Sequence, residues 1–515
     1  MRSLILGSLD LAASLPVLLL GFTVSGLTAY IIYQKYFHPL AEYPGPFLAS
    51  ITDLWQVHEF LSLKQPYNLT KLHERYGEFV RYGPDKLSIT AEDVVPLVYQ
   101  KGGQRLPKTE FYEAFGSKTP NVFGMRSPEL HSVRRRHMSH SFSPTSVKGM
   151  EQYLDENIKT LRDKIHKFAK KGEAFDLKKM LHYYTIDVLG ELAFSRSFGV
   201  QVSDDESRVL PVIPHTLLGS ALGAWPAMTK TLKLWLPKLP NQNLQALFAG
   251  RAKCAAVAAE CVQKRLREVE QDEEKGKVQR KDILTNLILA RHPDTGEKIA
   301  RTDLEAEAFG MMQVSLLYLI LLERTRLCVR EVDENLTSLD NGKDVYSIME
   351  VESSLPFLRT CVKENYRLTP VFTMPLARRV TAPEGIVVAG RHIKQGTSVA
   401  VCNYSFHHNP RVWGNNHDVF DPSRWDQPDT AARARYLMHF GLGGRQCLGK
   451  TLAQSNIYKL TSTLLREFDF QLADSSERQA ISRGEYHGRL PEMISVGVSD
   501  LAGPLMVFAQ ARTQL

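Results

Sequence analysis

The pattern of apolar positions is densest near the start of the chain. Residues 11–33 read LAASLPVLLLGFTVSGLTAYIIY and contain no charged side chain. As a helix, this run spans ~35 Å, which is enough to cross a hydrocarbon layer of ~30 Å. A cleaved signal peptide is the alternative, but the run is long for one and no obvious small-residue cleavage site follows it. We therefore expect an uncleaved transmembrane anchor at 11–33.

A proline-rich segment separates this anchor from the body of the chain. Residues 34–46 contain Pro39, Pro44 and Pro46, each of which lacks the N–H group that a continuing helix needs. We therefore expect a stiff hinge over 34–46.

Patterns in the body predict many helices and few strands. Two-residue alternation at 78–89 and 385–393 predicts strands, and short strands and turns return after residue 370. Apolar residues recur at three- and four-residue steps through most of 144–327, which is typical of amphipathic helices. The clearest helical stretches are 151–171 and 251–271.

The body shows no clear point of division. Dense charge of both signs at 268–282 predicts a solvated connector, but no internal repeat and no Gly/Ser linker occurs. A chain of 515 residues has room for roughly two to four domains. We nevertheless expect a single domain over 47–515, mainly α with small β-sheets.

Charge and cysteine content narrow the possible partners and compartment. The net charge of +8 is spread over 64 basic and 56 acidic residues, which suits an acidic partner or a membrane surface. Nucleic acid is disfavoured because no long Lys/Arg run with interleaved aromatics occurs. The six cysteines form no CxxC pair and no zinc-site spacing, which fits a reducing compartment.

The sequence HFGLGGRQCLGK at 439–450 isolates Cys447 among four glycines. Such glycines let the backbone approach a flat, bulky group closely. The amphipathic pattern that follows predicts a helix, so Cys447 lies at a helix N-terminus, which stabilises a thiolate. A thiolate on this loop suits an axial ligand of haem iron, with Arg445 pairing with a haem propionate. A buried loop cysteine is the alternative, and the loop alone leaves both open.

Two further motifs precede this loop in the chain. KENYR places Glu364 and Arg367 on one helix face, and FDPSRW supplies Arg424. In this order the three motifs resemble the signature of the cytochrome P450 family, and the resemblance covers nearly the whole chain. Glu364, Arg367 and Arg424 match a buried Glu–Arg–Arg cluster behind the haem. The cysteine loop matches that of the family at Phe440, Gly443, Arg445, Cys447 and Gly449.

The resemblance implies the cytochrome P450 fold, a helix-rich prism with small β-sheets, here preceded by one N-terminal transmembrane helix. It implies haem b (iron protoporphyrin IX) buried between two long helices, with Cys447 as the axial iron ligand. His131 and Arg135 match the helix that reaches the propionates, with a solvated basic face as the alternative. Arg379 matches the strand residue that reaches the other propionate, and Arg378 is its rival.

The family pattern also implies a substrate pocket lined by two segments of this chain. Ordinary core packing explains these apolar residues equally well. They are Phe123, Met125, Val371, Phe372 and Met374.

The implied activity is that of a haem-thiolate monooxygenase, which activates O2 with electrons from an NADPH–cytochrome P450 reductase. The opening PGPFLASITDLW looks most like that of membrane-bound fungal members, many of which tailor secondary metabolites while others hydroxylate benzoate-like aromatics. We therefore expect a small apolar substrate and contact with membrane lipid. We also expect a single-pass protein of the endoplasmic reticulum membrane whose catalytic domain faces the cytoplasm. Lys35 and His38 favour this orientation, and Arg2 opposes it.

One stretch departs from the family pattern. In the family, a central helix carries a small-residue pair, an acid and a threonine that open a groove for O2 and relay protons. Residues 303–336 contain no such series and are short by roughly a dozen residues, or ~18 Å of helix. Glu307 precedes the gap after Met312 and Thr325 falls too late, so we assign no residue to oxygen activation.

Three explanations of this gap stay open. A mis-called intron could have removed part of an active monooxygenase. The chain could be a degenerate, non-catalytic haem or membrane protein. It could also be a same-fold isomerase or dehydratase that rearranges peroxides or activated substrates without reductive O2 cleavage.

Overall fold

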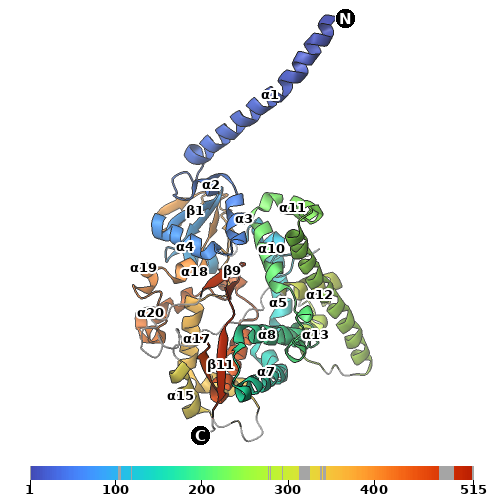
Figure 1. Ribbon diagram of the computed structural model, residues 1–515, viewed down its shortest axis with the longest axis vertical. Coiled ribbons are helices and arrows are strands. Elements are labelled where there is room, and N and C mark those ends of the chain that lie inside the picture. The colour runs from blue at the N-terminus through green and yellow to red at the C-terminus, as the bar shows by residue number, and fades with distance from the viewer. Residues whose placement is uncertain are drawn as a thin grey trace.

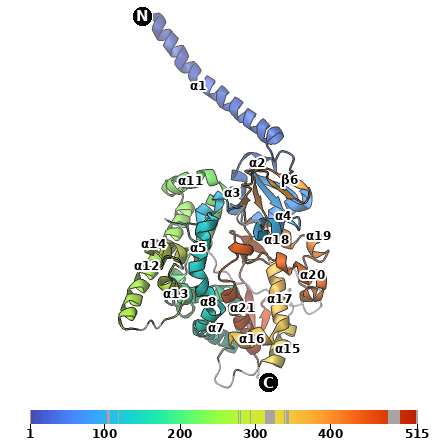
Figure 2. The same ribbon diagram turned by 180° about the vertical axis from the view of Figure 1, so that it is seen from behind.

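A computed structural model of the chain describes residues 2–101, 106–116, 119–276, 278, 280–292, 294–311, 325–336, 339, 344–474 and 492–512. Helix α1 (Arg2–Ile32) projects from the body as a single element (Figures 1 and 2). The stretch Pro16–Phe37 is long and apolar enough to cross a membrane, and 0% of its apolar 18-residue window is buried inside the protein. The predicted run at 11–33 is therefore helical, and its side chains from residue 16 onward are left for another apolar medium.

The predicted hinge at 34–46 packs against the body of the protein. A short π-helix, η1 (Tyr33–Phe37), leads into it. Arg81 donates hydrogen bonds to the backbone oxygen and the side-chain oxygen of Gln34, at 2.8 and 2.6 Å. Leu40 and Tyr43 are buried in a core cluster with the first strands. Segment 34–46 thus packs against the domain, and the packed body begins before residue 47.

The N-terminal part of the body combines short helices with two strands of a sheet. The predicted strands at 78–89 are confirmed as an antiparallel pair, β1 and β2, in which Phe79 lies opposite Ile89. The elements are α2 (Phe47–Ile51), α3 (Leu54–Leu61), α4 (Gln65–Tyr76), β1 (Phe79–Gly83), β2 (Lys86–Ile89), η2 (Pro96–Lys101) and η3 (Glu110–Phe115).

Helices fill the middle of the chain, as the spacing of apolar residues predicts. Helix α7 coincides with the predicted stretch 151–171. The elements up to α11 are α5 (Pro128–Ser139), η4 (His140–Phe142), α6 (Pro144–Gly149), α7 (Glu151–Lys171), β3 (Phe175–Asp176), α8 (Leu177–Ala193), α9 (Val200–Ser203), η5 (Glu206–Arg208), α10 (Val212–Ala224), η6 (Pro226–Met228) and α11 (Thr229–Trp235).

The predicted connector at 268–282 is partly wrong. Helix α12 continues to Glu274, because Val269 is buried in the core and the Glu and Gln residues around it are good helix formers. The elements from α11 to α17 are η7 (Leu236–Lys238), α12 (Gln242–Glu274), α13 (Ile283–Leu289), α14 (Arg301–Met311), α15 (Thr325–Asn335), α16 (Ile348–Ser354) and α17 (Pro356–Leu368). The predicted gap after Met312 falls on residues 312–324, which lie outside the described residues.

The C-terminal part returns to short strands around one long helix. The strands predicted at 385–393 are confirmed as β5 and β6. The elements are β4 (Arg378–Arg379), β5 (Ile386–Val388), β6 (Arg391–Ile393), β7 (Ser398–Ala400), α18 (Asn403–His407), α19 (Pro410–Trp413), η8 (Pro422–Asp426), α20 (Pro428–Arg433), η9 (Ala434–Tyr436), η10 (Gly443–Arg445), α21 (Lys450–Glu467), β8 (Phe468–Leu472), β9 (Met493–Ser495), β10 (Ser499–Leu501) and β11 (Met506–Ala511).

Two sheets position the candidate site. The larger has the strand order β1-β2-β7-β4, so that residues 378–379 lie beside a strand formed by residues 398–400. The other has the order β3-β11-β8 and packs against α7 and α8 at the opposite end of the body (Figure 1). Helix α21 lies among α7, α15 and α16, so the loop that precedes it is attached to the helical part, with residues 439–449 half-buried or exposed.

Candidate active site

The loop before α21 has a backbone that only glycine allows at its tightest point. Gly443 has a φ of +60°, and a Cβ there would lie 2.3 Å from the backbone oxygen of Tyr99. The loop is closed by a hydrogen bond of 2.7 Å from the Cys447 N–H to the oxygen of Phe440. Helix α21 begins at Lys450, with Gly449 as its N-cap residue. The sequence prediction that Cys447 stands just before a helix is therefore confirmed.

The Cys447 thiol is half-buried, and its environment acts on its pKa in both directions. Burial raises the pKa, while a hydrogen bond from the Gly449 N–H and the charge of Arg135 lower it; burial has the larger effect. The helix start alone therefore does not make this thiol a thiolate, and a metal ion at the sulfur would. Among the described residues, no group of three or more His, Cys, Asp or Glu side chains could hold a metal ion. The described part of the chain thus offers no further ligand set for an ion at Cys447, and a bound group such as a porphyrin would supply one.

Five nitrogen-bearing side chains gather beside this loop, and we name them the basic cluster. Three of them, Lys108, His131 and Arg378, are each only 5% exposed. Within the described residues, none of the four cations forms an ion pair with an acidic side chain; each donates to neutral oxygens instead. The members are Lys108, His131, Arg135, Arg378 and Arg445.

Burial and the charges within the basic cluster lower the pKa values of Lys108, His131 and Arg445. Burial and the charges of Arg378 and Arg445 hold the pKa of Lys108 well below its ordinary value. Burial, followed by the charge of Arg445, lowers the pKa of His131 to about 3. Buried cations without a counter-charge are costly, so this arrangement favours an anionic ligand. The two propionates of haem b, beside a cysteine that can bind its iron, fit this donor set.

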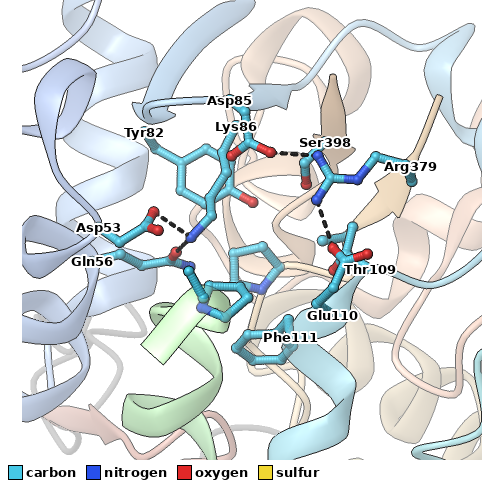
Figure 3. A pocket seen from close by; sticks show the side chains of 14 residues that line it. Asp53, Gln56, Tyr82, Asp85, Lys86, Thr109, Glu110, Phe111, Arg379 and Ser398 are labelled. Carbon is cyan, nitrogen blue, oxygen red and sulfur yellow. Dashed lines mark hydrogen bonds and ion pairs between the residues drawn. The ribbon is translucent and has the colours of Figure 1, made fainter. Parts of the chain in front are cut away.

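Arg378 and Arg379, the two sequence candidates for one propionate contact, have different surroundings in the structure. Arg379 forms ion pairs with Asp85 and Glu110 at the edge of a cavity of about 310 Å³ (Figure 3). Arg378 is buried and donates to the hydroxyl of Tyr112 at 2.9 Å. Adjacent residues of a strand face opposite sides, and β4 turns Arg378 toward the basic cluster. The prediction that Arg379 reaches a propionate stays a prediction, and the position of Arg378 favours this residue over Arg379 for that contact.

The three residues of the Glu–Arg–Arg motifs form a separate, closed cluster. Glu364 and Arg367 are 0% exposed, and their side chains meet at 2.7 Å. Arg424 reaches the same carboxylate at 3.2 Å. Other guanidinium N–H groups donate to the backbone oxygens of His407 and Trp413, at 3.0 and 2.8 Å, and to the side-chain oxygen of Asn416 at 3.1 Å. Each arginine thus has an acidic partner within the chain, and its other donors are hydrogen-bonded there.

This closed cluster supports the cysteine loop from behind. Tyr366, which lies next to Arg367 on α17, stacks on His439 with ring centroids 4.0 Å apart. It also meets Phe440 edge-on at 5.3 Å. His407 accepts a hydrogen bond of 3.2 Å from the Met438 N–H. The start of the loop is therefore held against α17 and α18.

The predicted pocket residues meet across two segments. Phe123 lies edge-on to Phe372, with ring centroids 5.8 Å apart. Met374 is 1% exposed and belongs to the same aromatic cluster as Phe123, whereas Met125 is buried beside the segment that Arg445 binds. Val371 is half-buried and packs with a different small cluster around Val496. The structure thus brings Phe123, Phe372 and Met374 into one cluster and joins Val371 to Phe372 in a second, while Met125 belongs to neither.

Sequence reasoning missed two residues of this site. Lys108 stands opposite Arg378 in an isolated antiparallel bridge and donates to the Phe123 oxygen at 2.5 Å. Tyr112 orients Arg378 through its hydroxyl. Neither lies in a motif, and the strand pairing that joins them to residue 378 links distant parts of the chain. No local signal in the sequence reveals them.

Comparisons with known proteins agree with this geometry. The family model described as "Cytochrome P450" matches residues 44–496. A pisatin demethylase of Fusarium vanettenii is 25% identical over 460 residues, covering 86% of each chain. The cytochrome P450 monooxygenase gsfF of Penicillium aethiopicum is 31% identical over 477 residues, covering 88% of this chain and 92% of that one. A retinoic acid bound cyanobacterial CYP120A1 shares the fold with a TM-score of 0.70 at 18% identity, covering 91% of this chain and 99% of that chain.

Proposed function

This chain belongs to the cytochrome P450 family, and on that premise we propose that it is a haem-thiolate monooxygenase of fungal secondary metabolism. The observation that carries the proposal is the juxtaposition of Cys447, on its glycine loop, with a buried basic cluster that has no acidic partner among the described residues. Relatives named as monooxygenases favour this function over a non-catalytic protein or a same-fold isomerase.

The residues of the site divide into those that would hold haem b and those that would hold substrate. Cys447 would bind the iron, and Arg135, Arg378 and Arg445 would meet the propionates, with Lys108 adding charge. Haem supplies the activation of O2, and a thiolate ligand favours cleavage of the O–O bond.

The residues of this chain would position the iron ligand and the substrate. The hydrogen bond from the Cys447 N–H to the Phe440 oxygen, together with the glycine backbone, fixes the sulfur just before the N-terminus of α21. The rings of Phe123 and Phe372 form an apolar wall that would orient a small apolar substrate and keep water from the reacting atoms. The relatives include a pisatin demethylase, which supports a ring-bearing metabolite as the substrate class.

We further propose attachment to the endoplasmic reticulum membrane, with the catalytic domain in the cytoplasm beside an NADPH–cytochrome P450 reductase. Helix α1 supports the anchor, and exposed apolar side chains lie on α2, α3 and α11, at the end of the body from which α1 leaves (Figure 1). These side chains are Phe47, Leu48, Leu54, Leu61, Leu234 and Trp235. The net charge of +8 suits an acidic reductase surface, a contact that salt should weaken. Membrane flotation and reduction by purified reductase at rising salt would test both points.

The direct test of the haem-thiolate assignment is the spectrum of the reduced, CO-bound protein. Cys447→Ser should abolish the absorption band that thiolate ligation gives, while Cys402→Ser, a buried cysteine away from the loop, should retain it. An unchanged band in Cys447→Ser would overturn the assignment.

The missing helix segment predicts a second effect, on coupling. Proton delivery by a placed group is commonly worth roughly 10²–10⁴ in rate. Product formed per NADPH should therefore be low for this chain and rise after insertion of the family's helix segment behind Met312.

A further inference from the structure

The segment 121–126 crosses between α14 and the cysteine loop and has a fixed shape of its own. The Asn121 side-chain oxygen accepts a hydrogen bond of 2.7 Å from the Gly124 N–H. The Asn121 backbone oxygen accepts one of 2.9 Å from the Met125 N–H. The segment is thus a hydrogen-bonded turn that can move as a unit.

One side of this turn faces the candidate haem site. Arg445 donates to the backbone oxygens of Met125 and Arg126 at 2.8 and 3.0 Å. Lys108 donates to the backbone oxygen of Phe123, whose ring contacts Phe372. The position of the turn therefore decides where the Phe123 ring stands in the pocket.

The other side of the turn is fastened to α14 by one carboxylate. Both oxygens of Glu307 accept the Val122 N–H, at 3.0 and 3.1 Å. Glu307 is 2% exposed. One helical turn further, a Cβ at Gly310 would lie 2.4 Å from the Asn121 side-chain nitrogen, so the turn sits directly on the helix backbone.

We infer that Glu307 is a positioning residue that clasps the turn 121–126 onto α14 and thereby sets how firmly the pocket holds an aromatic ligand. Its effect on the pocket rests on the proposed function, because it assumes that Phe123 lines the substrate site. The clasp itself is a property of the described chain and can be measured without haem.

Few charged groups face the Glu307 carboxylate. Arg134 of α5 lies 3.6 Å away and is itself paired with Asp303 of α14 at 2.5 Å. His137, one turn further along α5, has a pKa below its ordinary value because it is partly buried beside other cations and His292. From the turn, the carboxylate meets only the Val122 N–H among the described contacts. Burial is the largest influence and raises the pKa of Glu307 from 4.5 to about 7.

The sign of the pH dependence follows from linkage. Opening the turn would admit water to Glu307 and return its pKa toward 4.5, so the closed form binds the proton more tightly. Protonation therefore favours closure, and the clasp weakens as the pH rises through about 7. Each unit by which opening relaxes the pKa changes the closing equilibrium roughly tenfold.

Three variants separate this role from a general loss of structure. Glu307→Gln keeps a neutral oxygen that accepts the Val122 N–H, so its clasp should be firm and independent of pH. Glu307→Ala has no acceptor, so its turn should be loose at every pH. Glu305→Gln is the matched control, because Glu305 lies on the same helix and pairs only with Arg301 among the described ion pairs.

The first readout is hydrogen exchange of the amides in 121–126, corrected for intrinsic rates, in the haem-loaded and haem-free full chain. We expect protection in the unmodified chain and in Glu305→Gln to fall about fourfold between pH 6.5 and pH 8. Glu307→Gln should keep its protection at both values, and Glu307→Ala should lack it at both. Equal protection in the unmodified chain and Glu307→Ala, or a pH response that persists in Glu307→Gln, would overturn the inference.

The second readout is the spectral shift that 4-phenylpyridine, a neutral aromatic nitrogen ligand, produces on the haem-loaded protein. Its dissociation constant should rise with pH in parallel with exchange for the unmodified chain, and stay flat in Glu307→Gln. A turn that responds to pH while ligand affinity does not would show that Phe123 does not line the pocket. Absence of a thiolate CO band in all variants would instead contradict the proposed haem site and leave the exchange result as the test of the clasp.

Discussion

Two clusters of arginines lie near the cysteine loop, and they differ in where their counter-charge comes from. Arg367 and Arg424 share the carboxylate of Glu364, and their other N–H groups donate to backbone oxygens. Arg378 and Arg445 are gathered with Lys108, and no acidic side chain pairs with them among the described residues.

This difference separates a role in folding from a role in binding. A buried cluster whose arginines share an acidic partner within the chain stabilises one arrangement of the backbone, here that of α17 and the segment after α18. A buried cluster of cations with no acidic partner among the described residues gains a counter-charge when a ligand brings it. A substitution in the first cluster should therefore lower the stability of the folded protein. A substitution in the second should weaken retention of the cofactor.

The largest effect is expected from opening the closed cluster. Glu364→Ala leaves two buried guanidinium groups without a counter-charge, which should cost about 3–5 kcal/mol of folding free energy. We expect misfolded or haem-free protein, measured by soluble yield and haem content. Glu305→Ala, which removes an exposed i,i+4 pair, should cost less than about 1 kcal/mol. A stable, haem-loaded Glu364→Ala protein with altered substrate choice would contradict the assignment of this cluster to folding.

A smaller effect is expected from the basic cluster. Arg378→Leu removes a cation and relieves repulsion, so the fold should persist while haem is held less tightly. A hydrogen bond to a charged group is worth about 1.5–3 kcal/mol, so haem should dissociate roughly 10–150 times faster. Transfer of haem to apomyoglobin measures this rate. Normal haem retention together with a lower melting temperature would assign Arg378 to the fold instead.

The smallest effect is expected one residue further along β4. Arg379→Leu breaks ion pairs with Asp85 and Glu110 at the edge of the cavity, far enough into solvent that each contributes at most about 1 kcal/mol. Haem transfer should match that of the unmodified chain. Accelerated haem loss in Arg379→Leu but not in Arg378→Leu would restore the assignment that the sequence pattern favours.

These neighbouring arginines show where sequence reasoning stops. The cysteine loop, the helix after it and the Glu364–Arg367 spacing depend on local order, so the sequence is sufficient to predict them. Which of two adjacent strand residues faces the site depends on how β4 pairs with β7, a contact that no local pattern encodes. Lys108 is invisible for the same reason, since its bridge to Arg378 joins distant parts of the chain.

The central claim is that the basic cluster exists to meet carboxylates, and esterified haem tests it most directly. Haem b and its dimethyl ester share the iron and the ring, but the ester has no propionate charge. We expect the chain to bind haem b at least about tenfold more tightly than the ester, in line with one or more charge-assisted hydrogen bonds. In Arg378→Leu this preference should shrink. Equal affinity for the two porphyrins in the unmodified chain would contradict the account.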